Sequence, residues 1–340
     1  MIFHHMPTAI SDPSHDSGML LTYSITLGIL IGIYMPFIGG AALLMKMKDR
    51  LSAGVILRVW RLLSQHNPSS LWRLAGWLTP IYTLFATRER RVTRSNLARA
   101  YPMLDQRQRD RLSRLSLRHS VTTVLELGFA WQGTPDRVNT AIKAVHGQAL
   151  LDQAQADGKG VIILAPHFGN WEVLNFWLSS HMPFTAMYEP PRIAPLNDTI
   201  RQGRERMGAH LVPTTARGVS SLLKALKRCE AVGILPDQVP EDTGGVMALF
   251  FGFPAYTATL LPKLVARTQA RVIAAVAQRR PHGDGFELHF MDADARVYDT
   301  DEVVSAQGVN ASVEAIIALD PVQYQWEYKR YKHTSHLHVD

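Results

Sequence analysis

The sequence predicts an α/β fold, with a mixed central sheet flanked by helices and an N-terminal membrane-anchoring helix before it. Three observations support this prediction. From residue 160 onward, short apolar strand patterns alternate with amphipathic helical patterns. Residues 17–45 carry no charged side chain. The composition, with 46% hydrophobic and 19% charged residues, is that of a folded chain with a large core and excludes a disordered one.

The uncharged run at residues 17–45 is long enough to cross a bilayer with tilt, despite Pro36. A cleaved signal peptide fits poorly, because the segment before the run holds no Lys or Arg and the run itself is too long. Acidic residues precede the run and basic residues follow it. By the positive-inside rule, residues 1–16 are then a short non-cytoplasmic tail, and residues 46–340 of this single-pass protein face the cytoplasm. The alternative is a buried pair of helices in a soluble core.

The net charge of +7 is concentrated in residues 46–99, which hold eleven Lys or Arg and two acidic residues. The remainder of the chain is slightly acidic, so no nucleic-acid-binding surface is predicted on the α/β part. A basic segment beside a membrane anchor favours anionic lipids and acidic proteins as partners. Within residues 51–86, arginines are mixed with aromatic residues, which suits a membrane interface or, alternatively, a helical layer over a core. These aromatic residues are Trp60, Trp72, Trp77 and Tyr82.

After the anchor we expect one membrane-associated domain, with a basic helical portion at 46–135 and an α/β portion at 136–335. Residues 107–131 have the pattern of an amphipathic helix. Residues 243–262 are uncharged but rich in Gly and Pro, which predicts a loop and then a core helix, and not a second membrane span. The expected strands are 161–165, 184–188, 209–212, 231–235, 272–277 and 286–290, and the expected helices are 171–180, 196–206, 218–228, 257–268 and 310–318.

The single cysteine, Cys229, excludes an intrachain disulfide and a cysteine-clustered metal site. The sequence also lacks a P-loop, a Gly-x-Gly-x-x-Gly fingerprint and a Gly-x-Ser-x-Gly elbow. The last of these absences removes the interpretation as a serine hydrolase.

The most informative segment is the buried strand at 161–165 with the turn and helix that follow it. His167 falls at the carboxyl end of that strand, where ligands collect in α/β sheets. Asn170 supplies turn and helix-cap chemistry, and Glu172 falls in the first turn of the next helix. A catalytic imidazole needs a carboxylate that holds its tautomer and stabilises its cation, so this segment is suited to present a general base for a hydroxyl group.

The His-x4-acid spacing is weak by itself, because short motifs recur by chance. Two other pairs in the chain have the same spacing: His282 with Glu287, and His289 with Asp294. The first of these pairs spans a turn before the strand at 286–290, and the second runs out of that strand. Only His167 and Glu172 have a strand–turn–helix setting. The alternative is that His167 is a structural histidine at a strand end.

The segment His167-Phe-Gly-Asn-Trp-Glu172 resembles the catalytic motif of the lipid A biosynthesis lauroyl/myristoyl acyltransferase family. Further motifs of that family are matched in the expected order, from about residue 46 to residue 332. Each motif is loose alone, but the ordered series is specific. The matching segments are Arg94 to Pro102, Met187-Tyr-Glu-Pro-Pro191 with Asn197, Arg201 to Gly208, Arg217-Gly218, Leu235-Pro-Asp-Gln-Val239, Val246 with Phe250-Phe-Gly252, and Gln325-Trp-Glu-Tyr-Lys-Arg330.

The resemblance implies a sheet of the His-x4-Asp/Glu acyltransferase type in an enzyme of the bacterial inner (cytoplasmic) membrane. It implies transfer of a fatty acyl chain from acyl carrier protein to the hydroxyl of a 3-hydroxyacyl chain on a phosphorylated lipid A precursor. A thioester is already activated, so no cofactor and no metal are expected; what the reaction needs is a deprotonated alcohol. The alternatives are a phospholipid or other glycolipid acyltransferase and, in a different class, a non-catalytic membrane scaffold.

The resemblance also implies roles for the motif residues. His167 would take the proton of the attacking alcohol, and Glu172 would orient the ring and offset its charge. The tetrahedral oxyanion needs positive or N–H donors. Arg204 is the candidate for that role or for holding a substrate phosphate, with Arg201 and Arg206 as competitors.

Three more residues complete the expected substrate-binding and oxyanion group. Asp237, at the end of a predicted strand, would position an arginine or the acceptor sugar, or alternatively cap the strand. Asn170 and Arg217 are the other two. A basic face of one predicted helix is a candidate docking surface for acyl carrier protein, and it consists of Arg217, Lys224, Lys227 and Arg228.

Overall fold

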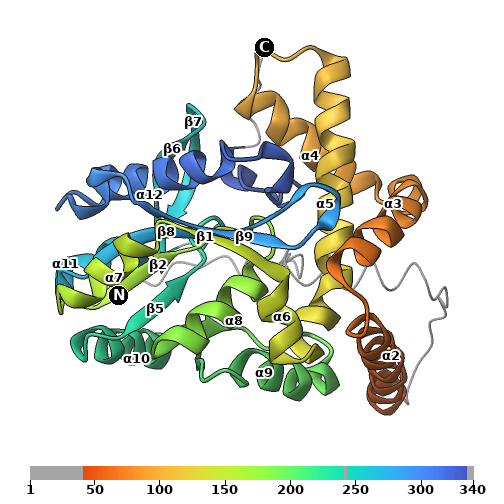
Figure 1. The fold of residues 1–340 in the computed structure, drawn as a ribbon. Helices are drawn as coiled ribbons and strands as arrows, with labels where there is room; N and C mark the ends of the chain where they lie inside the picture. The colour runs from red at the N-terminus through yellow and green to blue at the C-terminus, as the bar shows by residue number, and fades with distance from the viewer. Residues whose placement is uncertain (1–40, 241–242, 335–340) are drawn as a thin grey trace, which may run out of the picture.

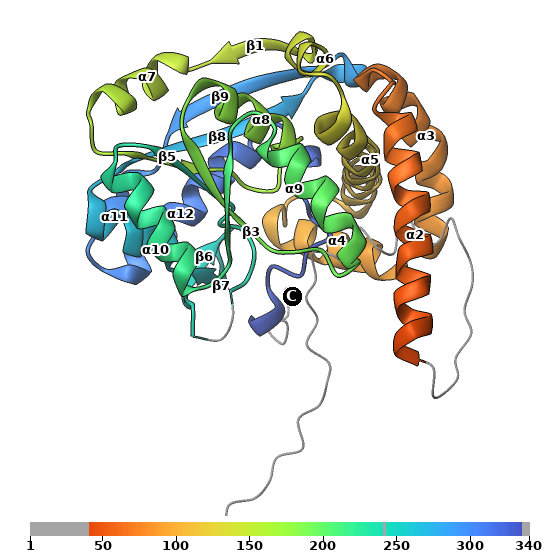
Figure 2. The ribbon, with the colours of Figure 1, turned by 90° about the horizontal axis from the view of Figure 1, so that it is seen from below.

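The computed structural model describes residues 41–240 and 243–334. Four helices come first: α2 (Ala41–Leu63), α3 (Pro68–Phe85), α4 (Thr87–Ala100) and α5 (Gln106–Gln132). The other three all contact α5, and Figure 2 shows α2 and α3 on one side of it. The helix expected at 107–131 is confirmed as α5. Its start is set by a capping box, in which Asp105 and Gln108 satisfy each other's backbone N–H groups.

A seven-stranded sheet in the order β1-β9-β8-β2-β5-β3-β4 lies beside these helices (Figure 1). The strands are β1 (Ile142–His146), β2 (Val161–Leu164), β3 (Phe184–Tyr188), β4 (His210–Pro213), β5 (Ala231–Ile234), β8 (Arg271–Arg279) and β9 (Phe286–Asp292). All pairings are parallel except that of β8 with β9, so the sheet is mixed, as expected. All six expected strands are present. The sequence pattern does not predict β1, because this partly exposed edge strand shows neither strict alternation nor a continuous apolar run.

Helices cover both faces of the sheet. Side chains along β2 alternate between two cores: Val161 and Ile163 belong to one, and Ile162 and Leu164 to the other. All of them are fully buried, which is typical of a central parallel strand. Figure 1 shows α8 on one side of the sheet and α12 on the other.

The expected helices of the α/β part are confirmed, with shifted ends. They are α8 (Trp171–His181), α9 (Asn197–Glu205), α10 (Ala216–Lys227), α11 (Leu260–Thr268) and α12 (Glu302–Ile317). Two further helices, α6 (Pro135–Ala141) and α7 (Gln148–Ala156), are not predicted from the sequence. Short 3₁₀ turns are η1 (Ala194–Leu196), η2 (Pro281–Gly283), η3 (Ala295–Tyr298), η4 (Pro321–Gln323) and η5 (Lys332–Thr334). The largest shift is at α12, which begins early because the Asp301 side chain accepts the backbone N–H groups of Val303 and Val304.

The expectation of a loop and a helix at 243–262 is wrong for most of that segment. It forms a β-hairpin of β6 (Gly245–Phe250) and β7 (Phe253–Ala258), and the helix begins only at Leu260. Phe251 and Gly252 connect the strands with φ of 49° and 78°. Two consecutive residues with positive φ are the geometry of a tight hairpin turn, and the glycine adopts it without strain.

The predicted membrane anchor at 17–45 falls mostly on residues 17–40, which lie outside the described residues. Among the described residues, no helix combines the length and the apolar character that a membrane crossing requires. The aromatic residues of 51–86 divide between the two expected environments. Trp60 and Tyr82 are buried, whereas the side chain of Trp77 is 80% exposed.

Candidate active site around His167

His167 lies directly beyond β2 and is almost fully buried. Its ring Nδ1 lies 2.9 Å from Oδ1 of Asp237, and its backbone N–H donates to Oδ2 of the same carboxylate at 2.9 Å. Asp237 follows β5, and β5 is the parallel neighbour of β2. Both residues therefore leave the same edge of the sheet, where the carboxyl ends of parallel strands meet.

The Asp237 carboxylate sets the tautomer of the histidine. Burial alone would raise the pKa of Asp237, but the charge that His167 carries when protonated, together with its hydrogen bonds, holds it below its ordinary value. An ionised carboxylate only accepts hydrogen bonds, so in the neutral ring Nδ1 carries the proton and Nε2 keeps its lone pair. Nε2 lies 3.4 Å from Nε2 of Gln238, and the ring packs edge-on against Trp171. An imidazole held in this way can act as a general base.

Glu172 is not the partner of His167, which corrects the expected role of this acid. Its side chain, on the first turn of α8, binds the Arg204 guanidinium: Arg204 Nε lies 2.9 Å and 3.1 Å from the two carboxylate oxygens, and Nη2 also donates to Oε1. Trp171 Nε1 donates to Oε1 at 3.1 Å. The side chain of Glu172 points from α8 toward Arg204 on α9, whereas the ring of His167 points toward Asp237, which follows β5. Asp237 correspondingly binds the histidine and not an arginine.

The three arginines of α9 and its end have distinct surroundings. Arg204 lies within 6 Å of two aromatic rings, 5.4 Å from Tyr188 and 5.8 Å from Trp131. Arg201 is exposed and pairs with Glu205 at 2.9 Å. Arg206 donates to backbone carbonyls at the end of α5. Of the three, Arg204 contacts the His167–Glu172 segment, through Glu172, and its role there stays a prediction.

Asn170 and Arg217 are placed differently from the expected substrate-binding group. Asn170 is fully buried and caps α8: its Oδ1 accepts the N–H groups of Glu172 and Val173, while its Nδ2 donates to Glu126 at 2.9 Å. It therefore positions the segment from inside. Arg217 lies exposed on the first turn of α10. Among the described residues, the hydrogen bonds of the His167 ring go to Asp237 and Gln238, and not to Asn170 or Arg217.

A buried ion pair under the site is not predicted from the sequence. Arg279, at the end of β8, and Glu126, on α5, are fully buried and joined by hydrogen bonds of 2.6 Å and 2.9 Å. Arg279 also contacts Nδ1 of His119 at 2.8 Å. Burial, and then the charges of Arg279 and Arg118, lower the pKa of His119 well below its ordinary value, so that ring is neutral. The signal in the sequence is Glu126 itself, a charge inside the apolar part of α5.

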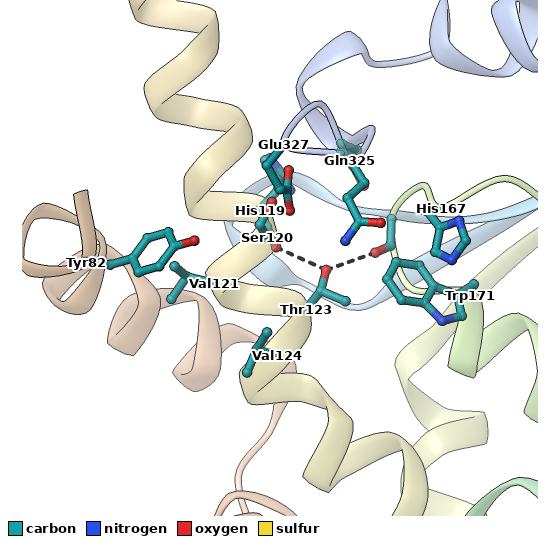
Figure 3. A pocket seen from close by; sticks show the side chains of 12 residues that line it. Tyr82, His119, Ser120, Val121, Thr123, Val124, His167, Trp171, Gln325 and Glu327 are labelled. Carbon is teal, nitrogen blue, oxygen red and sulfur yellow. Dashed lines mark hydrogen bonds between the residues drawn. The ribbon is translucent and has the colours of Figure 1, made fainter. Parts of the chain in front are cut away.

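A cavity runs from α3 across α5 to His167 (Figure 3). In Figure 3, Tyr82 of α3 lies at one end, and His167 and Trp171 lie together at the other, with the side chain of Gln325 opposite them. Glu327, which also lines it, is buried, and burial raises its pKa. Gln325 and Glu327 belong to a motif that the sequence resemblance included without a role. The remaining lining residues are His119, Ser120, Val121, Thr123, Val124, Gly169 and Gln323.

Known proteins are similar in sequence to this chain over nearly all of its described residues. The sequence model of the family described as bacterial lipid A biosynthesis acyltransferase matches residues 45–333. The lipid A biosynthesis palmitoleoyltransferase of Escherichia coli (strain K12) is 26% identical over 73% of this chain and 80% of its own length. The lipid A biosynthesis lauroyltransferase of the same organism is 25% identical over 77% of this chain and 85% of its own. A phosphatidylinositol mannoside acyltransferase of Mycobacterium tuberculosis is 27% identical over 43% of this chain and 48% of its own.

Proposed function

This chain belongs to the bacterial lipid A biosynthesis acyltransferase family, and on that premise we propose that it transfers a fatty acyl chain from acyl carrier protein to the hydroxyl of a 3-hydroxyacyl chain on a phosphorylated lipid A precursor. The observation that carries the proposal is the buried pair of His167 and Asp237, with 2.9 Å between Nδ1 and Oδ1, at the end of a cavity. An oriented imidazole with an available Nε2 is what alcohol attack on a thioester requires.

The proposed reaction proceeds in two steps. Nε2 of His167 takes the proton as the acceptor oxygen attacks the thioester carbonyl carbon, and Asp237 offsets the charge of the imidazolium. The tetrahedral intermediate then expels the carrier protein's thiolate, which takes the proton back from Nε2. The products are the ester and the free thiol of the carrier protein, so no cofactor or metal takes part.

Arg204 is proposed to stabilise the negative charge of the substrates, with Glu172 as its positioning residue. Three hydrogen bonds from the guanidinium to Glu172 fix its plane beside Tyr188 and Trp131. A planar guanidinium held in this way suits a phosphate or an oxyanion. This assignment gives the second acid of the His-x4-acid motif a role that does not pass through the histidine.

The assay offers acyl carrier proteins with several acyl chains and a tetra-acylated lipid A precursor to the detergent-purified full chain, with detection by mass spectrometry. We expect one acyl mass increment, lost in His167→Ala. The matched control is His282→Asn, at an exposed histidine of another His-x4-acid pair; Asn tolerates its φ of 58°. An increment that persists in His167→Ala would contradict the role of the base. No increment with any donor would overturn the proposed reaction.

A second candidate acceptor is supported by the mannoside relative. The phosphatidylinositol mannoside acyltransferase matches 43% of this chain. Part of the chain is therefore similar to a protein named for a different glycolipid. Offering a phosphatidylinositol mannoside in the same assay separates the two acceptors. Incorporation into the mannoside but not into the lipid A precursor would favour this second candidate.

We further infer that the enzyme is held at the cytoplasmic face of the inner membrane by residues 17–45, with residues 46–340 in the cytoplasm. Support comes from the outer face of α3, where Trp77, Ile81, Leu84 and Phe85 are all exposed. They recur at helical spacing, so they form one apolar stripe. Tyr82, on the opposite face of α3, lines the cavity that ends at His167. A lipid-facing α3 would thus lie next to that cavity.

The position of the stripe is tested in the full chain, reconstituted into anionic lipid vesicles. In a Cys229→Ser background, Trp77→Cys carries an environment-sensitive fluorophore, and Met103→Cys, at an exposed residue outside the stripe, is the control. We expect blue-shifted emission and quenching by lipid nitroxides at 77 only. Equal, water-like emission at both positions would contradict a lipid-facing α3. Release of the protein by salt alone would contradict the anchor.

A further inference from the structure

One residue from each of the two His-x4-acid pairs outside the proposed active site lies on β9, beside the edge strand β1. Glu287, from one pair, and His289, from the other, are two residues apart on β9 and therefore point to the same face. The edge strand β1 pairs with β9 in parallel, and the register places His146 directly opposite His289. One acid and two imidazoles thus meet on one face of two neighbouring strands.

The three side chains lie close to one another. Nε2 of His146 lies 3.2 Å from Oε2 of Glu287, and Nε2 of His289 lies 4.0 Å from the same oxygen. The two imidazole rings are stacked, with 4.6 Å between their centroids and 23° between their planes. One ligand atom from each of the three residues lies within 4.8 Å of those of the other two.

His289 lacks the hydrogen bond that a shielded imidazole nitrogen normally has. Its Nε2 is inaccessible to solvent and has no hydrogen-bond partner among the described residues, although the Glu287 carboxylate faces it. A shielded polar atom without a partner is unfavourable, and a bound ion would supply that partner. A cation between the two groups would satisfy the nitrogen and the carboxylate together.

We propose that His146, Glu287 and His289 bind one Zn²⁺ ion that ties the edge strand β1 to β9. Two imidazoles and a carboxylate are a regular zinc ligand set, with water in the fourth position. Tetrahedral bonds of about 2.0–2.1 Å place ligand atoms about 3.3 Å apart. The 3.2 Å contact already has this separation. Rotation of the stacked rings would bring the other ligand atoms, which lie within 4.8 Å of one another, to the same separation.

The ion has a structural position and not a catalytic one. In the sheet order, β9 and β8 lie between β1 and β2, the strand that leads to His167. The competing cation is Arg280, whose Nη1 lies 3.6 Å from Oε1 of Glu287. It approaches the other carboxylate oxygen, so Oε2 stays available to the ion. Zinc removal should therefore loosen β1 without altering the acyl transfer step.

The test measures zinc binding by the untagged, EDTA-treated full chain, through metal analysis after dialysis and through thermal unfolding. The sequence contains other histidines near both ends, among them His4, His5, His336 and His338, so the decisive quantity is a difference between variants. His289→Ala removes the shielded ligand. His146→Ala removes a half-exposed one with little risk to folding. His282→Asn is the matched control.

We expect the wild type and His282→Asn to retain one more zinc per chain than either site variant. Zn²⁺ should raise their Tm by at least about 3 °C, an effect that Mg²⁺ does not produce and that both site variants lose. Acyl transfer should be equal in all these proteins, so a failure of the zinc proposal is separable from a failure of the proposed function. Equal zinc content and equal Tm shifts in wild type and His146→Ala would overturn the proposal.

Discussion

Replacement of Asp237 by Asn tests which carboxylate serves the histidine. The amide keeps the size of the side chain but loses its charge, and its NH₂ group donates a hydrogen bond. Placed 2.9 Å from Nδ1, that donor would favour the tautomer with the proton on Nε2. A ring in this state cannot accept the proton of the alcohol, so the rate of acyl transfer must fall.

The size of the expected fall in rate follows from the loss of a buried hydrogen bond to a charged ring. A hydrogen bond to a charged group contributes about 1.5–3 kcal/mol, and its loss from the imidazolium alone slows the reaction by roughly 10- to 150-fold. The wrong tautomer adds to this, up to the full effect of a general base, about 10²–10⁴. We expect Asp237→Asn to lower kcat in that range, with the KM of the acceptor little changed.

A double-mutant cycle with Glu172→Gln makes the test specific. Because Glu172 binds Arg204 and Asp237 binds His167, the two substitutions damage different groups. Their effects on ln kcat should add, measured as initial rates of acyl transfer with saturating donor. Circular dichroism and Tm show whether each variant is folded. If Glu172→Gln has no further effect in the Asp237→Asn protein, both acids act through the histidine, and their roles are not separate.

Two further predictions concern the buried groups below the site. Arg279→Met leaves the Glu126 carboxylate buried without its partner, which costs about 3–5 kcal/mol and should lower Tm by roughly 10 °C. The double variant with Glu126→Leu should recover much of this loss. An unchanged Tm for the single variant would contradict the importance of the ion pair. The pKa of His119 lies well below its ordinary 6.5 in the folded chain, so below that pH the unfolded chain takes up a proton that the folded chain does not. The free energy of unfolding should therefore fall by about 1.4 kcal/mol for each pH unit below 6.5 from this residue, and the pH dependence of urea unfolding should be shallower in His119→Gln by that amount; equal slopes would contradict a buried neutral ring.

The α/β alternation, the boundaries of most strands and the position of His167 at a strand end follow from residues that are close in the sequence. Hydrophobic periodicity and cap chemistry act over a few residues, so they are visible without the fold. The hairpin at 245–258 shows the limit of this approach. Its alternation is visible only once the two positive-φ residues, Phe251 and Gly252, are known to form the turn.

Only the tertiary structure decided which side chains meet. His167 and Asp237 are 70 positions apart, and they touch because β2 and β5 are adjacent in the sheet. The motif spacing pointed instead to Glu172, whose direction depends on how α8 packs against α9. The cluster of His146, Glu287 and His289 likewise depends on the register of β1 on β9. Strand order and register are set by the burial of the whole sheet, which no local window of the sequence contains.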